Sequence, residues 1–179
     1  MRAVVAVGMM ALALPASAQD MAAFRSGPVF EGFAPHAPVE AAAELPDGTT
    51  FAVAFDVAEA ADADKRNRQI ESAARFLNMH VANGVEREDI RLAVVVHGGA
   101  SMDLLTDAAW QADGRGATNP SAAMIRAMLD AGIRVILCGQ SGAAHGLVAS
   151  DLIPGVETAL SAMTAHAVLQ GEGYTVNPF

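Results

Sequence analysis

From residue 50 onward, short continuous apolar runs alternate with segments that have helical periodicity. The run 51–57, FAVAFDV, is apolar except for Asp56, and the run 91–96 ends in three consecutive valines. Strands of a parallel sheet are buried on both faces, so their sequences are apolar throughout instead of alternating with polar residues. The pattern therefore predicts an α/β domain with a mostly parallel sheet covered by helices.

Periodicity and capping residues predict the other elements. Residues 68–83 form a predicted helix with one apolar face, made by Ile70, Ala73, Ala74, Leu77 and Val81. Asn119 is the expected N-cap of a helix over 120–131, because its side-chain oxygen can accept a hydrogen bond from the first turn. A last helix is predicted over 164–170, and short strands at 134–137, 157–162 and 174–176.

The first 18 residues have the composition of a secretory signal peptide. Arg2 precedes an apolar run over 3–14, and the small residues 16–18 form a cleavage sequence. The apolar run is too short to span a bilayer, which takes about 20 residues in a helix. We therefore expect cleavage before Gln19 and a soluble periplasmic protein with no membrane segment.

Residues 19–49 are predicted to form an extended arm in front of the α/β domain, which covers 50–179. Four prolines in the arm prevent a sustained helix. The segment 27–33, GPVFEGF, has enough apolar side chains to dock on a sheet edge or on a neighbouring subunit.

Charge and cysteine content exclude several functions. The chain has 20 acidic against 11 basic side chains and a net charge of -9, so it lacks the clustered Lys and Arg that nucleic-acid binding requires. Cys138 is the only cysteine, so no internal disulfide can form. His36, His80, His97, His145 and His166 do not have the spacing of metal ligands. We expect no metal and no other cofactor.

His97 and Cys138 each come directly after a predicted strand, and ligands of open parallel sheets bind outside the carboxyl ends of the strands. We therefore expect both side chains to face one region. The neighbouring glycines offer free N–H groups and let a ligand approach the backbone. Such donors, His97 or His145 can activate a thiol whose ordinary pKa is about 8.5. A free cysteine is also often inert and packed, and spacing alone leaves both possibilities open.

The connection between His97 and Asn119 is much longer than the usual 4 to 6 residues. It is predicted to contain a short helix near 102–110 and a mobile turn at 112–118. Because this connection starts at the same sheet edge as Cys138, it is the candidate lid of the site.

A serine hydrolase is an alternative interpretation of the same region. Residues 139–143 approach the G-x-S-x-G sequence around a nucleophilic serine, and residues 97–99 are similar to an oxyanion-hole motif. Asp151 and His166 follow Ser141 in the chain order of that enzyme class. However, Ala143 replaces the last glycine, and we expect Ser141 to cap the next helix instead.

Several segments occur in a distinctive order: FDV at 55–57, VVVHGGA at 94–100, Asn119-Pro120, CGQS at 138–141, DLIPGV at 151–156 and ALSAMTAHAVLQGEGY at 159–174. Together they resemble the DsrE-like sulfur-relay family in its exported branch, over about residues 50–179. The resemblance implies a three-layer α/β/α domain with a five-stranded parallel sheet, assembled as homotrimers or hexamers. It also implies that Cys138 accepts a sulfane sulfur as a persulfide.

We therefore expect a sulfur carrier or sulfurtransferase that exchanges sulfur with donor and acceptor thiols, with Cys138 and His97 as catalytic residues. The expected substrate-binding residues are Gly98, Gly99, Asn119, Gly139, Gln140, Ser141 and His145. Relatives frequently have an arginine where His145 stands, which leaves the identity of the substrate open. A non-enzymatic module of the same fold, for binding a small anion or for assembly, is the other alternative.

Overall fold

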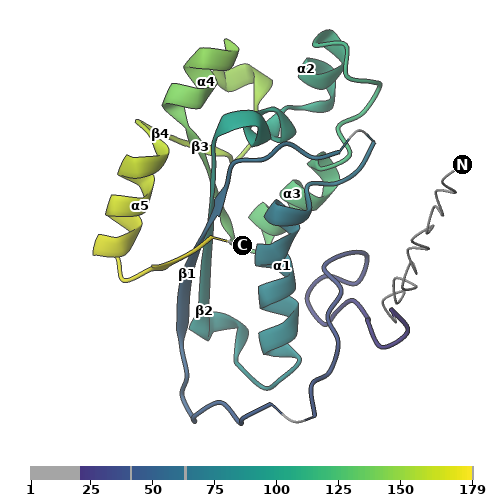
Figure 1. The fold of residues 1–179 in the computed structure, drawn as a ribbon, viewed down its shortest axis with the longest axis vertical. Helices are drawn as coiled ribbons and strands as arrows, with labels where there is room; N and C mark the ends of the chain where they lie inside the picture. Colours follow the sequence, from purple (N-terminus) through teal and green to yellow (C-terminus); the bar gives the residue numbers. More distant parts are fainter. Residues whose placement is uncertain (1–20, 41, 63, 179) are drawn as a thin grey trace, which may run out of the picture.

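The computed structural model describes residues 21–40, 42–62 and 64–178, so the predicted signal peptide and Gln19 lie outside the described residues. Strands and helices alternate along the chain (Figure 1), with 3-10 helices labelled η. The elements are β1 (Phe51–Val57), α1 (Arg68–Val81), η1 (Arg87–Asp89), β2 (Ile90–Val96), η2 (Gly98–Leu104), α2 (Asp107–Ala112), α3 (Ala122–Asp130), β3 (Arg134–Cys138), α4 (Gly139–His145), η3 (Ala149–Asp151), β4 (Glu157–Ala159), α5 (Ala162–Gly171) and β5 (Thr175–Asn177).

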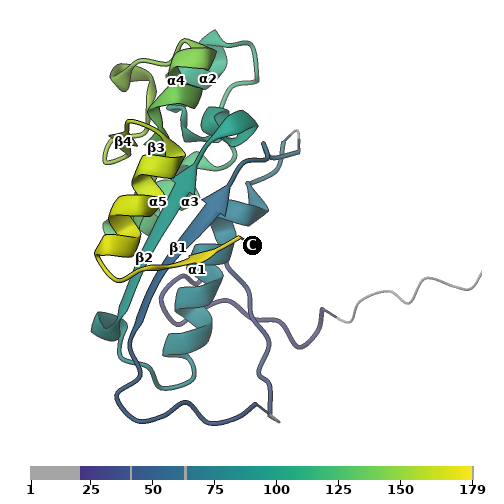
Figure 2. The same cartoon turned by 60° about the vertical axis from the view of Figure 1, so that its left-hand side comes forward.

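The five strands form one parallel sheet in the order β4-β3-β2-β1-β5. Helix α5 covers one face of this sheet, and α1 and α3 cover the other (Figure 2). The predicted α/β fold with three layers is therefore confirmed, and every strand of the sheet is parallel. Strands β1, β2 and β3 occupy the centre of the sheet and are the most continuously apolar in sequence, as burial on both faces requires.

Alternate residues of each central strand face opposite helical layers. On β1, Val53, Phe55 and Val57 pack into the core beneath α1 and α3. Ala54 packs instead into the smaller core beneath α5, which also contains Ala93, Val95, Ile136, Ala165 and Leu169. Because side chains alternate along a strand, the residues two positions beyond these strand residues also face the α5 layer.

Several element boundaries differ from the sequence prediction, and a local hydrogen bond explains two of them. Helix α3 starts at Ala122 and not at residue 120, because the Asn119 side-chain oxygen accepts from the Ser121 N–H in a separate preceding turn. Strand β4 ends at Ala159 and not at residue 162, because Ser161 is the N-cap of α5 and its hydroxyl accepts from the Thr164 N–H. Helix α1 ends at Val81, before the predicted end at residue 83.

The connection after His97 forms two helices, η2 and α2, instead of the predicted single helix near 102–110. Met102, Leu105 and Trp110 pack together in a small cluster within it. The Thr106 hydroxyl caps α2 by accepting from the Ala109 N–H. The first half of the candidate lid is therefore anchored by apolar packing, while residues 111–118 are exposed.

The arm packs on α1 of its own chain, and not on a sheet edge (Figure 1). Buried Asn78 of α1 accepts from the N–H groups of Val29 and Phe30 and donates to the carbonyls of Phe30 and Ala34. Glu71, also on α1, accepts from the Ala34 N–H. Polar side chains of a helix thus hydrogen-bond to the backbone of the arm, as a neighbouring strand would otherwise do.

None of the helices in the described part of the chain has the length and the apolar composition that a membrane span requires.

Candidate active site at the carboxyl edge of the sheet

Cys138 and His97 lie side by side on the α5 face of the sheet. Val96 of β2 pairs with Leu137 of β3, so the next residue of each strand, His97 and Cys138, continues the same register. Neighbouring strands are about 4.8 Å apart, and register partners in a parallel pair point to the same face. The sequence expectation that the two side chains face one region agrees with this register.

Cys138 is 5% exposed, but it is not surrounded by apolar groups alone. It is the last residue of β3 and the N-cap of α4, where free helical N–H groups point outward. Burial raises the pKa of the Cys138 thiol. Hydrogen bonds from the backbone and hydroxyl of Ser141, and from the backbones of Ala162 and Gln140, outweigh burial and hold this pKa below its usual range. The sulfur is therefore prepared to carry negative charge.

The turn after Cys138 requires glycine for steric reasons. A Cβ added to Gly139 would lie 2.6 Å from the carbonyl oxygen of Ala159 on the neighbouring strand β4. Gly98 has a φ of +53°, and a Cβ there would lie 2.9 Å from the Ala58 carbonyl oxygen. Real side chains do not tolerate such contacts, so both glycines allow the turns to pack closely around the sulfur.

Ser141 and His145 connect α4 to the turn after β2. The Ser141 hydroxyl accepts from the Gly98 N–H at 3.0 Å, and His145 Nε2 lies 3.1 Å from the Gly98 carbonyl oxygen. The expectation that Ser141 caps the next helix is wrong, because α4 begins at Gly139 and Ser141 already lies within it. The Gln140 amide donates to the Leu160 carbonyl oxygen, which joins α4 to the segment before α5.

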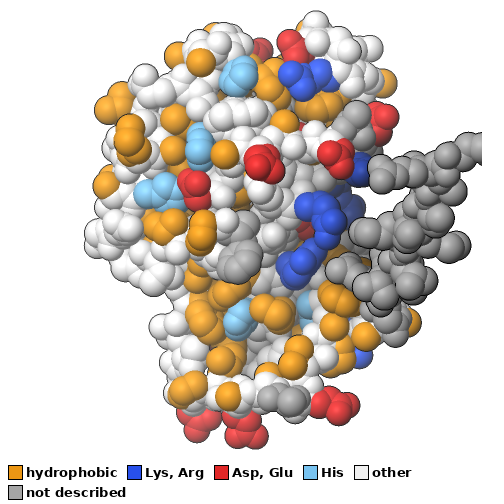
Figure 3. Space-filling model, in the orientation of Figure 1, with side chains coloured by type: hydrophobic (Ala, Val, Ile, Leu, Met, Phe, Trp, Pro, Cys, Tyr) orange, Lys and Arg blue, Asp and Glu red, His pale blue; other side chains and the backbone are white. Residues whose placement is uncertain are grey.

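The sequence did not identify Asp56 as part of this region, and it named His166 as a site residue only in the alternative hydrolase order. Asp56 Oδ2 lies 3.2 Å from His97 Nε2, and Asp56 Oδ1 lies 2.7 Å from His166 Nε2. Burial raises the pKa of Asp56, but the hydrogen bonds and charges of His166 and His97 hold it below its usual value. The face in Figure 3 shows histidine side chains next to an acidic one. The sequence feature that could have identified Asp56 is that it is the only polar residue in an otherwise apolar strand.

Two of the expected binding residues lie apart from these contacts. Asn119 is buried and donates to the backbone carbonyls of Asp103 and Leu105, so it holds the η2 to α2 connection. Gly99 is next to Ala58 and Ala60, with 3.5 Å from its added Cβ to the Ala60 backbone nitrogen. Among the described residues, neither is hydrogen-bonded to Cys138.

The hydrolase order of Ser141, Asp151 and His166 does not form a triad in space. Asp151 Oδ2 accepts from the Val148 N–H, and His166 is hydrogen-bonded to Asp56. Ser141 has no histidine among its hydrogen-bond partners. In the part of the chain that is described, no group of three or more His, Cys, Asp or Glu side chains is arranged to hold a metal ion.

The fold and this edge can be compared with known proteins. A model of the DsrE/DsrF-like family matches residues 50–178. The chain is similar to the solved structure of a protein of unknown function, MTH1491 from Methanobacterium thermoautotrophicum. Their sequence identity is 21% and the TM-score is 0.47, covering 72% of this chain and 99% of that chain. No curated protein matches this chain. The family match includes all five strands and both turns of the site, and confirms the family that the sequence resembles: the chain belongs to the DsrE/DsrF-like family.

Proposed function

We propose that this protein is an exported sulfur carrier in which Cys138 takes up a sulfane sulfur as a persulfide and passes it to an acceptor thiol. The observation that carries the proposal is the set of hydrogen bonds from Ser141, Ala162 and Gln140 that lowers the pKa of Cys138. The thiolate is the nucleophilic form of cysteine, and a packed, inert cysteine needs no such donors. Family membership supports a sulfur-relay role at the level of the fold.

The transfer reaction requires no metal and no organic cofactor. The Cys138 thiolate attacks the outer sulfur of a donor persulfide, and a new bond forms between the two sulfur atoms. The sulfur–sulfur bond of the donor breaks, and its electron pair leaves with the donor thiolate. Release repeats this exchange, with an acceptor thiolate attacking the outer sulfur and Cys138 leaving as thiolate. The same N–H donors can stabilise the anion before and after each step.

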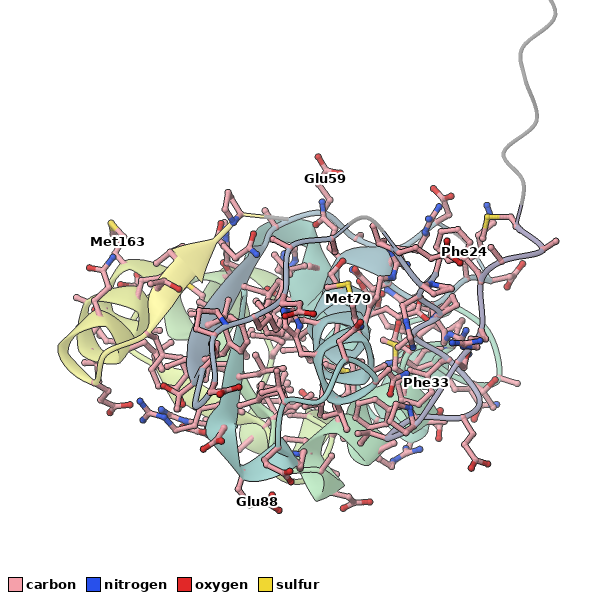
Figure 4. The ribbon with its side chains drawn as sticks, turned by 90° about the horizontal axis from the view of Figure 1, so that it is seen from below. Phe24, Phe33, Glu59, Met79, Glu88 and Met163 are labelled. Carbon is pink, nitrogen blue, oxygen red and sulfur yellow. The ribbon has the colours of Figure 1, made fainter. Side chains whose placement is uncertain are left out.

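Exposed apolar side chains next to the thiol support contacts with protein partners. Leu160 and Met163, at the start of α5, are 72% and 81% exposed, and Figure 4 shows Met163 pointing away from the body of the molecule. Ala162, between them, donates its backbone N–H to Cys138. We propose that the exposed side chains of Leu160 and Met163 contact the donor and acceptor thiol proteins. We also propose that the protein assembles as a homotrimer or hexamer. Light scattering after gel filtration tests this assembly.

Intact mass spectrometry tests the carrier function directly. The protein starting at Gln19 is reduced, incubated with thiosulfate or polysulfide, and weighed without reductant. Wild type is expected to gain roughly 32 Da for each sulfur atom, while Cys138→Ser gains nothing. Absence of the adduct on wild type, while a known persulfide carrier is labelled in the same mixture, refutes the proposal. N-terminal sequencing of protein from the periplasmic fraction tests the proposed export and cleavage before Gln19.

The low exposure of Cys138 favours one alternative, a module that binds a small anion without reacting with it. At 5% exposure the thiol lies beneath its neighbours and not on the surface. In this second function the N–H donors around Cys138 hold the anion, and Cys138→Ser binds sulfite or thiosulfate as tightly as wild type. Titration calorimetry on the two proteins, combined with the mass measurement above, separates the two functions.

A further inference from the structure

Asp56 holds two histidines that come from different layers of the fold. His97 follows β2, His166 lies on α5, and each uses its Nε2 atom to contact a different oxygen of the same carboxylate. Asp56 and His166 are 110 positions apart in the chain, and among the described residues neither is hydrogen-bonded to Cys138. The sulfur transfer steps described above do not use these two residues.

The carboxylate determines which nitrogen of His97 carries the proton. Asp56 has a lowered pKa, so at neutral pH its oxygens only accept hydrogen bonds. Nε2 of neutral His97 must then be the donor in the 3.2 Å contact. It follows that Nδ1 has a free lone pair and can act as a base.

The two histidines have different access to substrate. The His97 side chain is 30% exposed, and no described residue is a partner of its Nδ1 atom. The His166 side chain is 16% exposed, and its Nδ1 atom is buried without a partner. His97 is thus open to a ligand, while His166 holds the other oxygen of Asp56. The titratable groups on the elements around His97 include Asp56 on β1, Asp103 on η2, Arg134 and Cys138 on β3, His145 on α4 and His166 on α5.

We propose that Asp56, supported by His166, is a positioning residue that holds His97 as the base for sulfur release to thiols. The inference rests on the proposed carrier function. In the release step, His97 Nδ1 takes the proton of the acceptor thiol, and the resulting thiolate attacks the outer sulfur held on Cys138. The bond between that sulfur and the Cys138 sulfur breaks, and its electron pair returns to Cys138. Loading from thiosulfate differs, because sulfite leaves with the electron pair and no proton is transferred.

This difference gives a test within one protein. Wild type and Asp56→Asn are loaded with thiosulfate, desalted, and mixed with 2-mercaptoethanol, and persulfide loss is followed by quenched-flow mass spectrometry from pH 6 to pH 10. Asp56→Asn is expected to load within twofold of wild type and to release about tenfold more slowly at pH 7, less than the effect of deleting a general base outright. The deficit should shrink as the pH approaches 10, because an acceptor thiol that is already ionised needs no base. A merely structural role would slow loading and release alike at every pH.

Three results decide whether the carrier function and the role of Asp56 stand. If wild type does not load, the proposed carrier function fails, whatever Asp56 does. If wild type loads and Asp56→Asn releases sulfur at the wild-type rate at pH 7, the carrier function stands and the role of Asp56 is refuted. Nitrogen-15 NMR of the His97 ring in unmodified wild type, which requires no variant to fold, should show the proton on Nε2. Finding it on Nδ1 also overturns the inference.

Discussion

The Ser141 hydroxyl accepts a hydrogen bond from the Gly98 N–H at 3.0 Å and also hydrogen-bonds to Cys138. One side chain on α4 thus connects the turn after β2 to the turn after β3. These strands are neighbours in the sheet, so this connection sets how the His97 turn sits relative to the sulfur. The serine that a sequence motif suggested as a nucleophile is, in the structure, a support for the cysteine.

Ser141→Ala should make Cys138 less reactive without unfolding the protein. The variant removes one hydrogen bond to the sulfur and the acceptor of the Gly98 N–H, so the pKa of Cys138 rises toward its ordinary value. Alkylation by iodoacetamide at pH 7 is expected to slow about threefold to tenfold, because only the thiolate reacts. Ser72→Ala, on the exposed side of α1, is the matched control. Equal alkylation rates for Ser141→Ala and wild type would contradict the assigned role.

Gly139→Ala should destabilise the protein and disturb the site. Its Cβ would meet the Ala159 backbone oxygen at 2.6 Å, and backbone atoms cannot move aside cheaply. Overpacking of this kind costs about 1 to 3 kcal/mol, measurable by urea unfolding. Gly171→Ala is the control, because no heavy atom lies within 4 Å of its added Cβ. Similar stability losses in both variants would argue against a close approach at Gly139.

The stability of the protein relative to Cys138→Ser should increase with pH. The folded-state pKa of Cys138 is lowered, whereas the unfolded chain has the ordinary value of about 8.5. Between these two values the folded state binds fewer protons than the unfolded state, so unfolding becomes less favourable as pH rises. The contribution is complete above about pH 8.5 and is lost as pH falls through the folded value. Urea unfolding under reductant at pH 6 and pH 9 checks this, and a constant difference between the two proteins would refute a lowered pKa.

Asn78→Asp should release the arm. The substitution removes the amide donor to the Phe30 and Ala34 carbonyls and places a carboxylate against these oxygens in a buried position. A loss of about 2 to 4 kcal/mol is expected, together with faster proteolysis within residues 21–40. Asn83→Asp tests the same chemical change just after the same helix, at an exposed amide that bonds only to Met79. If both variants are cleaved at the wild-type rate, Asn78 does not hold the arm.

Local sequence patterns predicted the elements well because burial restricts which residue types occur at neighbouring positions of a strand or helix. A central parallel strand must be apolar at every position, and an amphipathic helix repeats its apolar residues every three to four positions. The start of α1 at Arg68 agrees with the helix predicted from this periodicity. Two of the boundaries that were wrong, at α3 and β4, lie where a polar side chain bonds to a backbone group two or three residues away. Such bonds compete with the pattern that predicts a longer element.

The sequence by itself determined the fold class, the family, and the meeting of His97 and Cys138 at one sheet edge. The fold class and the shared edge follow from apolar runs and from the rule that parallel strands share one carboxyl edge. The family follows from the resemblance of several segments, in their order along the chain, to that family. Only the tertiary structure decided that Asp56 is hydrogen-bonded to His166 and that Asn119 holds the connection after η2. It also decided that Ser141 is hydrogen-bonded to Cys138. Each of these contacts depends on packing between elements far apart in the chain. No local pattern encodes which polar side chains such packing brings within hydrogen-bond distance.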